Sequence, residues 1–233
     1  MRIEVLADAD AVAKRAAAVI AAEARQAVAA RNRFVMAVSG GRTPWVMLRA
    51  LAEEDVPWSS VHIFQVDERV APEGHADRNL THLRASLLER APLPAGQLYA
   101  MPVEMPDLQG AAAKYAAELQ RIAGTPPVLD LVHLGLGPDG HTASLVPGDP
   151  VLDITDRDVA VTGVYQGRNR LTLTYPVINR ARLILWLVTG SEKVSMFKRL
   201  EAADPSIPAG RVVQKNAVLL ADSAAAENTR KGL

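Results

Sequence analysis

The chain has 233 residues, of which 49% are hydrophobic and 22% are charged, and its 26 basic residues balance 26 acidic ones. This length suits one large α/β domain, which we expect to span residues 1–233. A net charge of zero gives no global attraction to nucleic acid or to an anionic membrane, so we expect neither as a partner. The sequence has no cysteine, which excludes disulfide bonds, thiolate catalysis and cysteine-ligated metal sites.

The N-terminal segment gives no sign of export. Residues 1–8 contain acidic side chains and no long apolar run, unlike a secretory signal. No stretch of the sequence approaches the ~18 consecutive apolar residues of a membrane span. Together with the lack of cysteine, these features lead us to expect a cytoplasmic protein.

The first half of the chain alternates between short apolar runs and longer helical segments. Asp8 or Asp10 is suited to cap the first helix, because an aspartate side chain accepts hydrogen bonds from first-turn amides. Continuous apolar runs are typical of central strands that are covered on both faces. We expect strands at residues 3–6, 34–38 and 61–66, a first helix that runs to Ala30, and further helices at residues 45–54 and 80–90.

The second half continues this alternation after a proline-rich connector at residues 91–106. Strand, loop and helix in regular succession predict an α/β fold in a single domain, with a doubly wound, mostly parallel sheet and helices on both faces. We expect helices at residues 108–122, at 176–180 and from Gly190 onward, and strands at residues 129–134, 171–174, 183–188 and 217–220.

Polar sequence follows the apolar strands at several points. In an open parallel sheet, ligands bind beyond the carboxyl ends of the strands. The fold is expected to bring these loops to one rim of the sheet, where we place the functional site. The loops in question are residues 39–43, 67–69, 135–141 and 189–193.

The loop at residues 39–43 has the composition of an anion cradle. Gly40 and Gly41 let backbone amides approach a phosphate, while Ser39 and Thr43 supply hydroxyl groups next to the positive end of a helix. The spacing matches neither a Walker loop nor the G-x-G-x-x-G fingerprint. From this loop alone, a phosphate site and an ordinary glycine turn are equally open.

The loop at residues 135–141 contains the strongest candidate for acid–base chemistry, His141. A histidine titrates near neutral pH, so it can take a proton from water and return it to a leaving oxygen. Asp139 is suited to orient the imidazole, to hold a substrate hydroxyl, or to cap a helix that starts near His141. The other histidines are expected to lie on the surface or in the core, and His133, within a strand, is expected to pack inside.

Several cations are candidate anion ligands. Lys193 is expected in the first turn of a helix, where the positive end disfavours a cation unless an anion is shared between them; the alternative is a solvated lysine. The guanidinium group of arginine suits bidentate contact with phosphate, and Arg42, Arg69, Arg168 and Arg170 lie in or near the polar loops. How these cations divide the anion contacts stays open.

Five motifs, in order along the chain, resemble those of the 6-phosphogluconolactonases, and the resemblance extends from about Phe34 to Val213. The wider group includes glucosamine-6-phosphate deaminases, which share a similar G-x-G-x-D-G-H loop. Deaminases carry a glutamate five residues after the loop histidine, and this chain has Val146 there, which favours the lactonases. The motifs are Ser39-Gly40-Gly41-Arg42-Thr43-Pro44, Asp67-Glu68-Arg69, Gly135 to Leu145, Arg170 to Thr174 and Thr189 to Lys193.

The resemblance implies a Rossmann-like fold of the sugar-phosphate isomerase and deaminase type, and hydrolysis of the lactone of 6-phosphogluconate in the pentose phosphate pathway. It implies that His141, beside Asp139, activates water, with no metal and no cofactor. The partner implied is a small phosphorylated sugar lactone, bound by a monomer or small homo-oligomer. The implied substrate and phosphate ligands are Ser39, Gly40, Gly41, Arg42, Thr43, Asp67, Arg69, Arg170 and Lys193.

Three other functions are weaker expectations. The absent glutamate argues against a deaminase or isomerase on the same fold. A non-catalytic sugar-phosphate sensor is expected to carry a DNA-binding region, and neither a helix-turn-helix pattern nor a basic segment precedes the domain. A dinucleotide-dependent dehydrogenase lacks support because the glycine fingerprint and its downstream acidic residue are missing.

Overall fold

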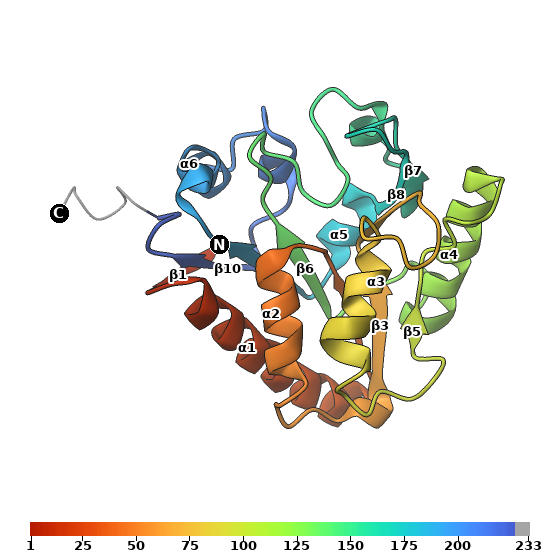
Figure 1. Ribbon diagram of the computed structural model, residues 1–233, viewed down its shortest axis with the longest axis horizontal. Helices are drawn as coiled ribbons and strands as arrows, with labels where there is room; N and C mark the ends of the chain where they lie inside the picture. The colour runs from red at the N-terminus through yellow and green to blue at the C-terminus, as the bar shows by residue number, and fades with distance from the viewer. Residues whose placement is uncertain (227–233) are drawn as a thin grey trace.

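The computed structural model describes residues 1–226 and is built around a 7-stranded sheet (Figure 1). The strand order is β1-β10-β9-β6-β2-β3-β5, and the pairs in this sheet are parallel. This confirms the predicted doubly wound, mostly parallel sheet. Its strands are β1 (Arg2–Leu6), β2 (Phe34–Val38), β3 (Val61–Gln65), β5 (Leu98–Tyr99), β6 (Leu131–Gly135), β9 (Leu183–Val188) and β10 (Ala217–Asp222).

Helices cover both faces of this sheet because successive side chains of a strand point to opposite faces. In β2, Phe34 and Met36 join one apolar cluster, with α1, α2 and α3, whereas Val35 and Ala37 join the other, with α4, α5 and α6. Figure 1 shows α2 and α3 in front of the sheet. The helices are α1 (Ala9–Arg31), α2 (Arg42–Leu51), α3 (Asn79–Leu83), α4 (Leu108–Ala123), α5 (Tyr175–Arg180) and α6 (Val194–Glu201).

A second, 3-stranded antiparallel sheet was only partly predicted. It contains β4 (Asp67–Arg69), β7 (Val159–Val161) and β8 (Arg170–Leu173), of which the sequence predicted β8 alone. The three residues of β4 are all charged and show no apolar alternation, so their strand conformation depends on pairing with β8.

Several element boundaries differ from the prediction. The side chain of Asp8 accepts a hydrogen bond from Ala11 N, which decides in its favour over Asp10 as the cap of α1. Helix α2 begins at Arg42, three residues before the expected residue 45, because Gly41, with φ 135°, already makes the turn from the strand. The predicted helix at residues 80–90 divides into α3 and a π-helical turn at Arg84–Leu88, and the proline-rich connector contains β5.

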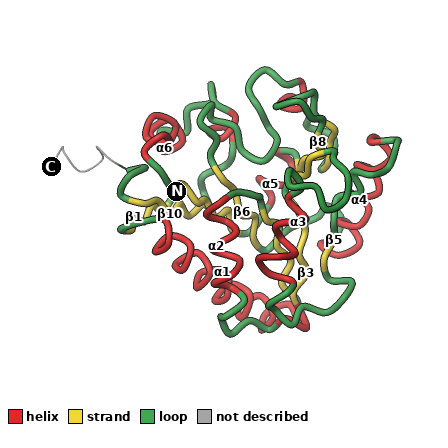
Figure 2. The backbone as a smooth tube through the Cα atoms, viewed as in Figure 1, coloured by secondary structure: helices red, strands yellow, loops and turns green. Residues whose placement is uncertain are grey.

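The winding of the chain changes direction between β2 and β6. From β2 the chain continues to β3 on one side, and from β6 it reaches β9 on the other, so a crevice opens where the carboxyl ends of β2 and β6 diverge. Long loops gather above this edge, as Figure 2 shows in its upper part. Within residues 1–226, no helix is both long and apolar enough to cross a membrane.

Asp130 lies at the opposite, amino end of this strand pair, just before β6. Its buried carboxylate accepts a hydrogen bond from Val35 N at 2.8 Å and pairs with the Arg31 guanidinium, also at 2.8 Å. The Asp130 side chain, just before β6, therefore binds both the start of β2 and the end of α1. This contact sets the relative position of the two strands whose other ends frame the crevice.

We expect Asp130→Ala to lower the free energy of unfolding by about 2 kcal/mol, because the buried Val35 amide loses its acceptor. For a chain of this size that corresponds to a fall of ~4–8 °C in melting temperature. Calorimetry measures the shift. Asp156→Ala removes an exposed carboxylate paired with Arg157 and is expected to leave the melting temperature unchanged. Equal falls in melting temperature for Asp130→Ala and Asp156→Ala would contradict the role of Asp130 in holding β2 and α1 beside β6.

Candidate active site

A polar pocket of about 190 Å³ opens at the carboxyl edge of the main sheet. Loops that follow β2, β3, β6 and β9 contribute to it, as expected for the rim of a parallel sheet. The tertiary structure thus brings together side chains that lie far apart in the sequence. Of the residues predicted from the sequence, the pocket is lined by Ser39, Gly40, Asp67, Arg69, His141, Arg170 and Lys193.

The remaining predicted anion ligands line neighbouring pockets instead. Gly41, Arg42 and Thr43 line an adjacent pocket of about 490 Å³, which shares Gly40 and Lys193 with the first. The predicted cradle at residues 39–43 is therefore divided between two pockets.

Within this cradle, the Thr43 hydroxyl is engaged by the protein itself, since its Oγ1 lies 2.7 Å from Thr189 Oγ1. Arg168 lines a third pocket, of about 260 Å³, together with Arg69 and Arg170. Its guanidinium pairs with Asp77 at 2.7 Å.

His141 and Asp139 form a hydrogen-bonded pair beside the first pocket. The Nδ1 atom of His141 lies 2.6 Å from Asp139 Oδ1. A carboxylate can only accept, so Nδ1 carries the proton and Nε2 presents the basic lone pair of the ring. A Cβ atom on Gly137 would lie only 2.1 Å from His141 Nδ1, which explains why glycine precedes this pair.

The surroundings of Asp139 keep it ionised. Burial acts against its charged form, but the nearby His141, two hydrogen bonds from that residue and one from the Tyr165 hydroxyl outweigh burial and lower the pKa of Asp139. The backbone amide of His141 donates to Asp139 Oδ1 at 3.2 Å. Within residues 1–226 no helix begins near His141, so the helix-cap role considered for Asp139 does not apply.

A buried arginine and a partly buried lysine line the pocket from other elements. Arg170, on β8, is 4% exposed, and its Nε atom has no hydrogen-bond partner within residues 1–226. Burial and the neighbouring Arg69 lower the pKa of Arg170. Burial also lowers the pKa of Lys193, against the opposing effect of Glu192 and Asp139. Since both cations are partly desolvated and close to like charge, an anion in the pocket would stabilise them.

The loop after β2 is held from inside by His133. As predicted, His133 is buried, and burial lowers its pKa to about 3, so the ring is neutral. Ser39 N donates to His133 Nδ1 at 3.2 Å, and the Ser39 hydroxyl donates to the His133 carbonyl at 2.9 Å. The single hydroxyl proton of Ser39 is thus engaged by the protein in this structure.

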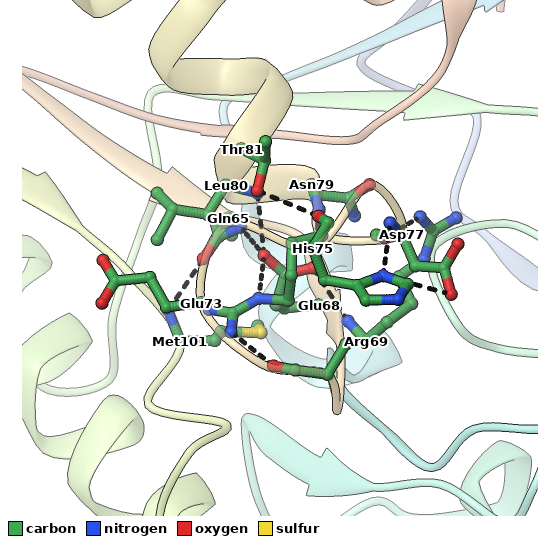
Figure 3. A network of polar contacts seen from close by, with 12 residues as sticks. Gln65, Glu68, Arg69, Glu73, His75, Asp77, Asn79, Leu80, Thr81 and Met101 are labelled. Atoms are coloured by element: carbon green, nitrogen blue, oxygen red, sulfur yellow. Dashed lines mark hydrogen bonds and ion pairs between the residues drawn. The ribbon is translucent and has the colours of Figure 1, made fainter.

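A buried carboxylate, Glu68, organises the opposite wall. Its Oε1 accepts from the backbone amides of Arg69 and Asn79, and its Oε2 accepts from the Leu80 amide and the Gln65 side chain, at 2.8–2.9 Å. Figure 3 shows Glu68 amid these contacts. Because Arg69 and Asn79 line the pocket, Glu68 fixes two site residues through their backbones.

Sequence reasoning missed several contributors to the site. Asn79 donates from Nδ2 to the Asp67 carbonyl at 2.9 Å, and a Cβ atom on Gly40 would lie only 2.0 Å from Asn79 Oδ1. Ser144 donates to Asp67 Oδ2 at 2.6 Å. Tyr165, in the loop before β8, contacts Asp139. Ser144 belongs to a motif singled out above, but no sequence spacing points to Asn79 or Tyr165.

Within the part of the chain that the structure describes, no group of three or more His, Cys, Asp or Glu residues is arranged to hold a metal ion.

A parallel sheet with a hydrogen-bonded aspartate and histidine beside a cation-lined pocket at its carboxyl edge is typical of enzymes that act on small anionic substrates. The chain matches the family model of glucosamine-6-phosphate isomerases/6-phosphogluconolactonase over residues 7–221. It is 37% identical to a 6-phosphogluconolactonase of Synechocystis sp., with 98% of each chain covered. The chain belongs to this family.

Solved structures agree with this assignment. The 6-phosphogluconolactonase of Trypanosoma brucei superposes with a TM-score of 0.87 at 26% identity, covering 98% of both chains. A monomeric glucosamine-6-phosphate deaminase superposes with a TM-score of 0.84 over 97% of this chain, at 16% identity, and shares the fold alone. The fold is therefore common to both activities, and the distinction depends on local residues.

We expect Glu68→Gln to lower the free energy of unfolding by about 3 kcal/mol, because the buried Arg78 guanidinium loses the buried one of its two carboxylate partners, at 3.2 Å, and keeps only the more exposed Glu104. The new amide group would also face hydrogen-bond donors on both sides. Urea unfolding measures the change.

Glu73→Gln is the matched control for this variant. Glu73 lies in the same segment but is exposed and pairs with Arg84. It is expected to unfold at the same urea concentration as the unmodified protein. A Glu68→Gln protein as stable as this control would contradict the organising role of the buried carboxylate.

Proposed function

We propose that this protein hydrolyses 6-phospho-D-glucono-1,5-lactone to 6-phospho-D-gluconate, the second step of the oxidative pentose phosphate pathway. The observation that carries the proposal is the hydrogen-bonded Asp139 and His141 pair beside a pocket that also holds Arg69, Arg170 and Lys193. Family membership and the names of the relatives support the same reaction. Val146, in place of the glutamate of the deaminases, favours the lactonase over the deaminase.

His141 acts as the general base. With Nδ1–H donated to Asp139, Nε2 takes a proton from a water molecule as that water attacks the C1 carbonyl of the lactone. The tetrahedral intermediate then breaks the bond between C1 and the ring oxygen, and the protonated His141 returns its proton to that oxygen. Asp139 stabilises the imidazolium between these steps. An ester carbonyl is already electrophilic, so this route requires no cofactor.

The phosphate group of the substrate is held by cations at the rim. Arg170 and Lys193 are partly desolvated, which strengthens a charge-assisted hydrogen bond to phosphate. Of the glycine loop, Ser39 and Gly40 line this pocket, and Gly41, Arg42 and Thr43, at the start of α2, supply amides to the adjacent pocket that shares Gly40 and Lys193. Asp67 and Arg69 line the first pocket and contact the sugar hydroxyls.

The domain organisation, the compartment and the oligomeric state are inferred in the same way. We assign the whole chain, residues 1–233, to one catalytic domain that works in the cytoplasm as a monomer or small homo-oligomer. A phosphorylated sugar is charged and stays in the compartment where it is made, so its lactonase is needed there.

A direct assay tests the proposed activity. Freshly prepared 6-phosphogluconolactone is mixed with the protein, and its hydrolysis is compared with the spontaneous rate. Release of ammonia from glucosamine 6-phosphate is measured in parallel. Lactone hydrolysis well above the spontaneous rate is expected, and deamination without lactone hydrolysis would favour the alternative enzyme.

We expect His141→Ala to reduce kcat by about 10²–10⁴-fold, the contribution of a general acid–base group, while the affinity for phosphorylated ligands stays nearly the same. Steady-state kinetics and product binding measure the two effects. His62→Ala removes a histidine of β3 that contacts Tyr99 and is expected to keep the full rate. A His141→Ala enzyme within twofold of the original rate would remove His141 from the mechanism.

Lys193→Ala is expected to weaken binding of the phosphorylated lactone by about 1.5–3 kcal/mol, the value of a hydrogen bond to a charged group. The rise in KM is measured with phosphorylated and unphosphorylated gluconolactone. Lys198→Ala, on α6, removes a lysine outside the pocket and serves as the control. An equal loss with both substrates would show that Lys193 does not bind phosphate.

A further inference from the structure

The loop between β7 and β8 brings a tyrosine to the acid–base pair. The Tyr165 hydroxyl donates to Asp139 Oδ2 at 3.1 Å, although the two residues lie 26 positions apart. In the same loop, Gln166 accepts a hydrogen bond from Arg170 at 3.1 Å. One loop therefore contacts both the proposed base system and a proposed substrate cation.

The two oxygens of Asp139 have different partners. Oδ1 accepts from the backbone amide of His141 at 3.2 Å and contacts Nδ1 of the same residue at 2.6 Å. Oδ2 accepts from Tyr165. A carboxylate held at one oxygen alone rotates about its terminal torsion, which has a broad energy profile. A donor at the second oxygen fixes the plane of the carboxylate and, with it, the direction of the imidazole.

The ring of Tyr165 is held in place by contacts with Arg170 and His141. The guanidinium carbon of Arg170 lies 4.9 Å from the centre of the tyrosine ring, in a cation–π contact. The His141 ring packs edge-on against it, with ring centres 5.5 Å apart. Burial and the nearby Asp139 raise the pKa of Tyr165, so its hydroxyl keeps its proton and remains a donor at neutral pH.

We propose that Tyr165 is a positioning residue for the Asp139 and His141 pair, acting through the second oxygen of Asp139. This inference rests on the proposed function, because it assigns Tyr165 a part in the same proton transfer. Tyr165 does not touch the reacting atoms. Its hydroxyl orients the Asp139 carboxylate, which in turn orients His141. A hydrogen-bond partner outside the site acts in the same way in other arrangements of histidine and carboxylate.

Tyr165→Phe tests this role, since it removes the hydroxyl and keeps the ring that packs on Arg170 and His141. We expect kcat to fall about threefold to tenfold, the effect of one hydrogen bond, with KM and melting temperature unchanged. Tyr175→Phe is the matched control. Its hydroxyl donates to the Pro208 carbonyl at 2.8 Å, away from the pair, and its loss is expected to leave kcat unchanged.

A second measurement does not depend on activity. The imidazole of His141 is titrated by NMR in the original and the Tyr165→Phe protein, with its signal assigned by its loss in His141→Ala. Besides Asp139 and Tyr165, the nearby charged groups are Lys193 and Arg170, and both proteins keep them. Without the tyrosine donor, the Asp139 carboxylate is no longer fixed in plane and its contact with the imidazolium weakens, so we expect the titration midpoint to move to lower pH.

The outcomes separate the inference from the proposed function. An unchanged kcat together with an unchanged His141 titration would overturn the role of Tyr165, even if the lactonase activity is present. A lower melting temperature with kcat and the His141 titration both unchanged would show that Tyr165 has only a structural role, and would also overturn the proposed positioning role. If the original protein lacks lactonase activity, the function fails, whereas the shifted titration would still support the contact between Tyr165 and Asp139.

Discussion

The negative charge of a carboxylate that is shielded from solvent must be balanced by hydrogen bonds and opposite charge within the protein. Glu68 is such a carboxylate, and the structure around it is arranged to meet this requirement. Its two oxygens accept hydrogen bonds from backbone amides at residues 69, 79 and 80 and from the Gln65 side chain, and Arg78 supplies the opposite charge. The segment from β4 to α3 consequently has one conformation that satisfies the charge. Arg69 and Asn79 are placed in the pocket by that conformation.

The other wall of the pocket is organised by glycines and by short-range contacts. Gly137 leaves room for the His141 ring within the loop after β6, and Gly40 leaves room for Asn79, so the loop after β2 lies close to the start of α3. The base system and the cations therefore meet in a small, partly desolvated volume. In such a volume, electrostatic contacts with a substrate are stronger than they would be in water.

The same fold carries both deaminases and lactonases, as its match to a deaminase structure at 16% identity makes plain. Within one such fold, the side chains at the site decide the activity. In this chain the Asp139 and His141 pair lies beside a pocket lined by cations, and an apolar Val146 follows it in the sequence. The loop from β7 to β8 adds Tyr165 and Gln166 to that arrangement from a distant part of the sequence.

The sequence by itself determined the central strands, the helices that cover them and the loops that carry chemistry. Apolar runs such as that of β2 must be buried, and a parallel sheet places the loops after such strands at one rim. It also singled out His141, Asp139 and Lys193, because a glycine-rich strand end and a helix start constrain their surroundings locally.

Only the tertiary structure decided the rest. Strand β4 exists because β8 pairs with it, the predicted cradle at residues 39–43 is divided between two pockets, and Asn79 and Tyr165 reach the site from separate segments. These contacts join residues far apart in the chain, and no local pattern specifies them. They depend on how the two sheets pack, which is a property of the whole fold.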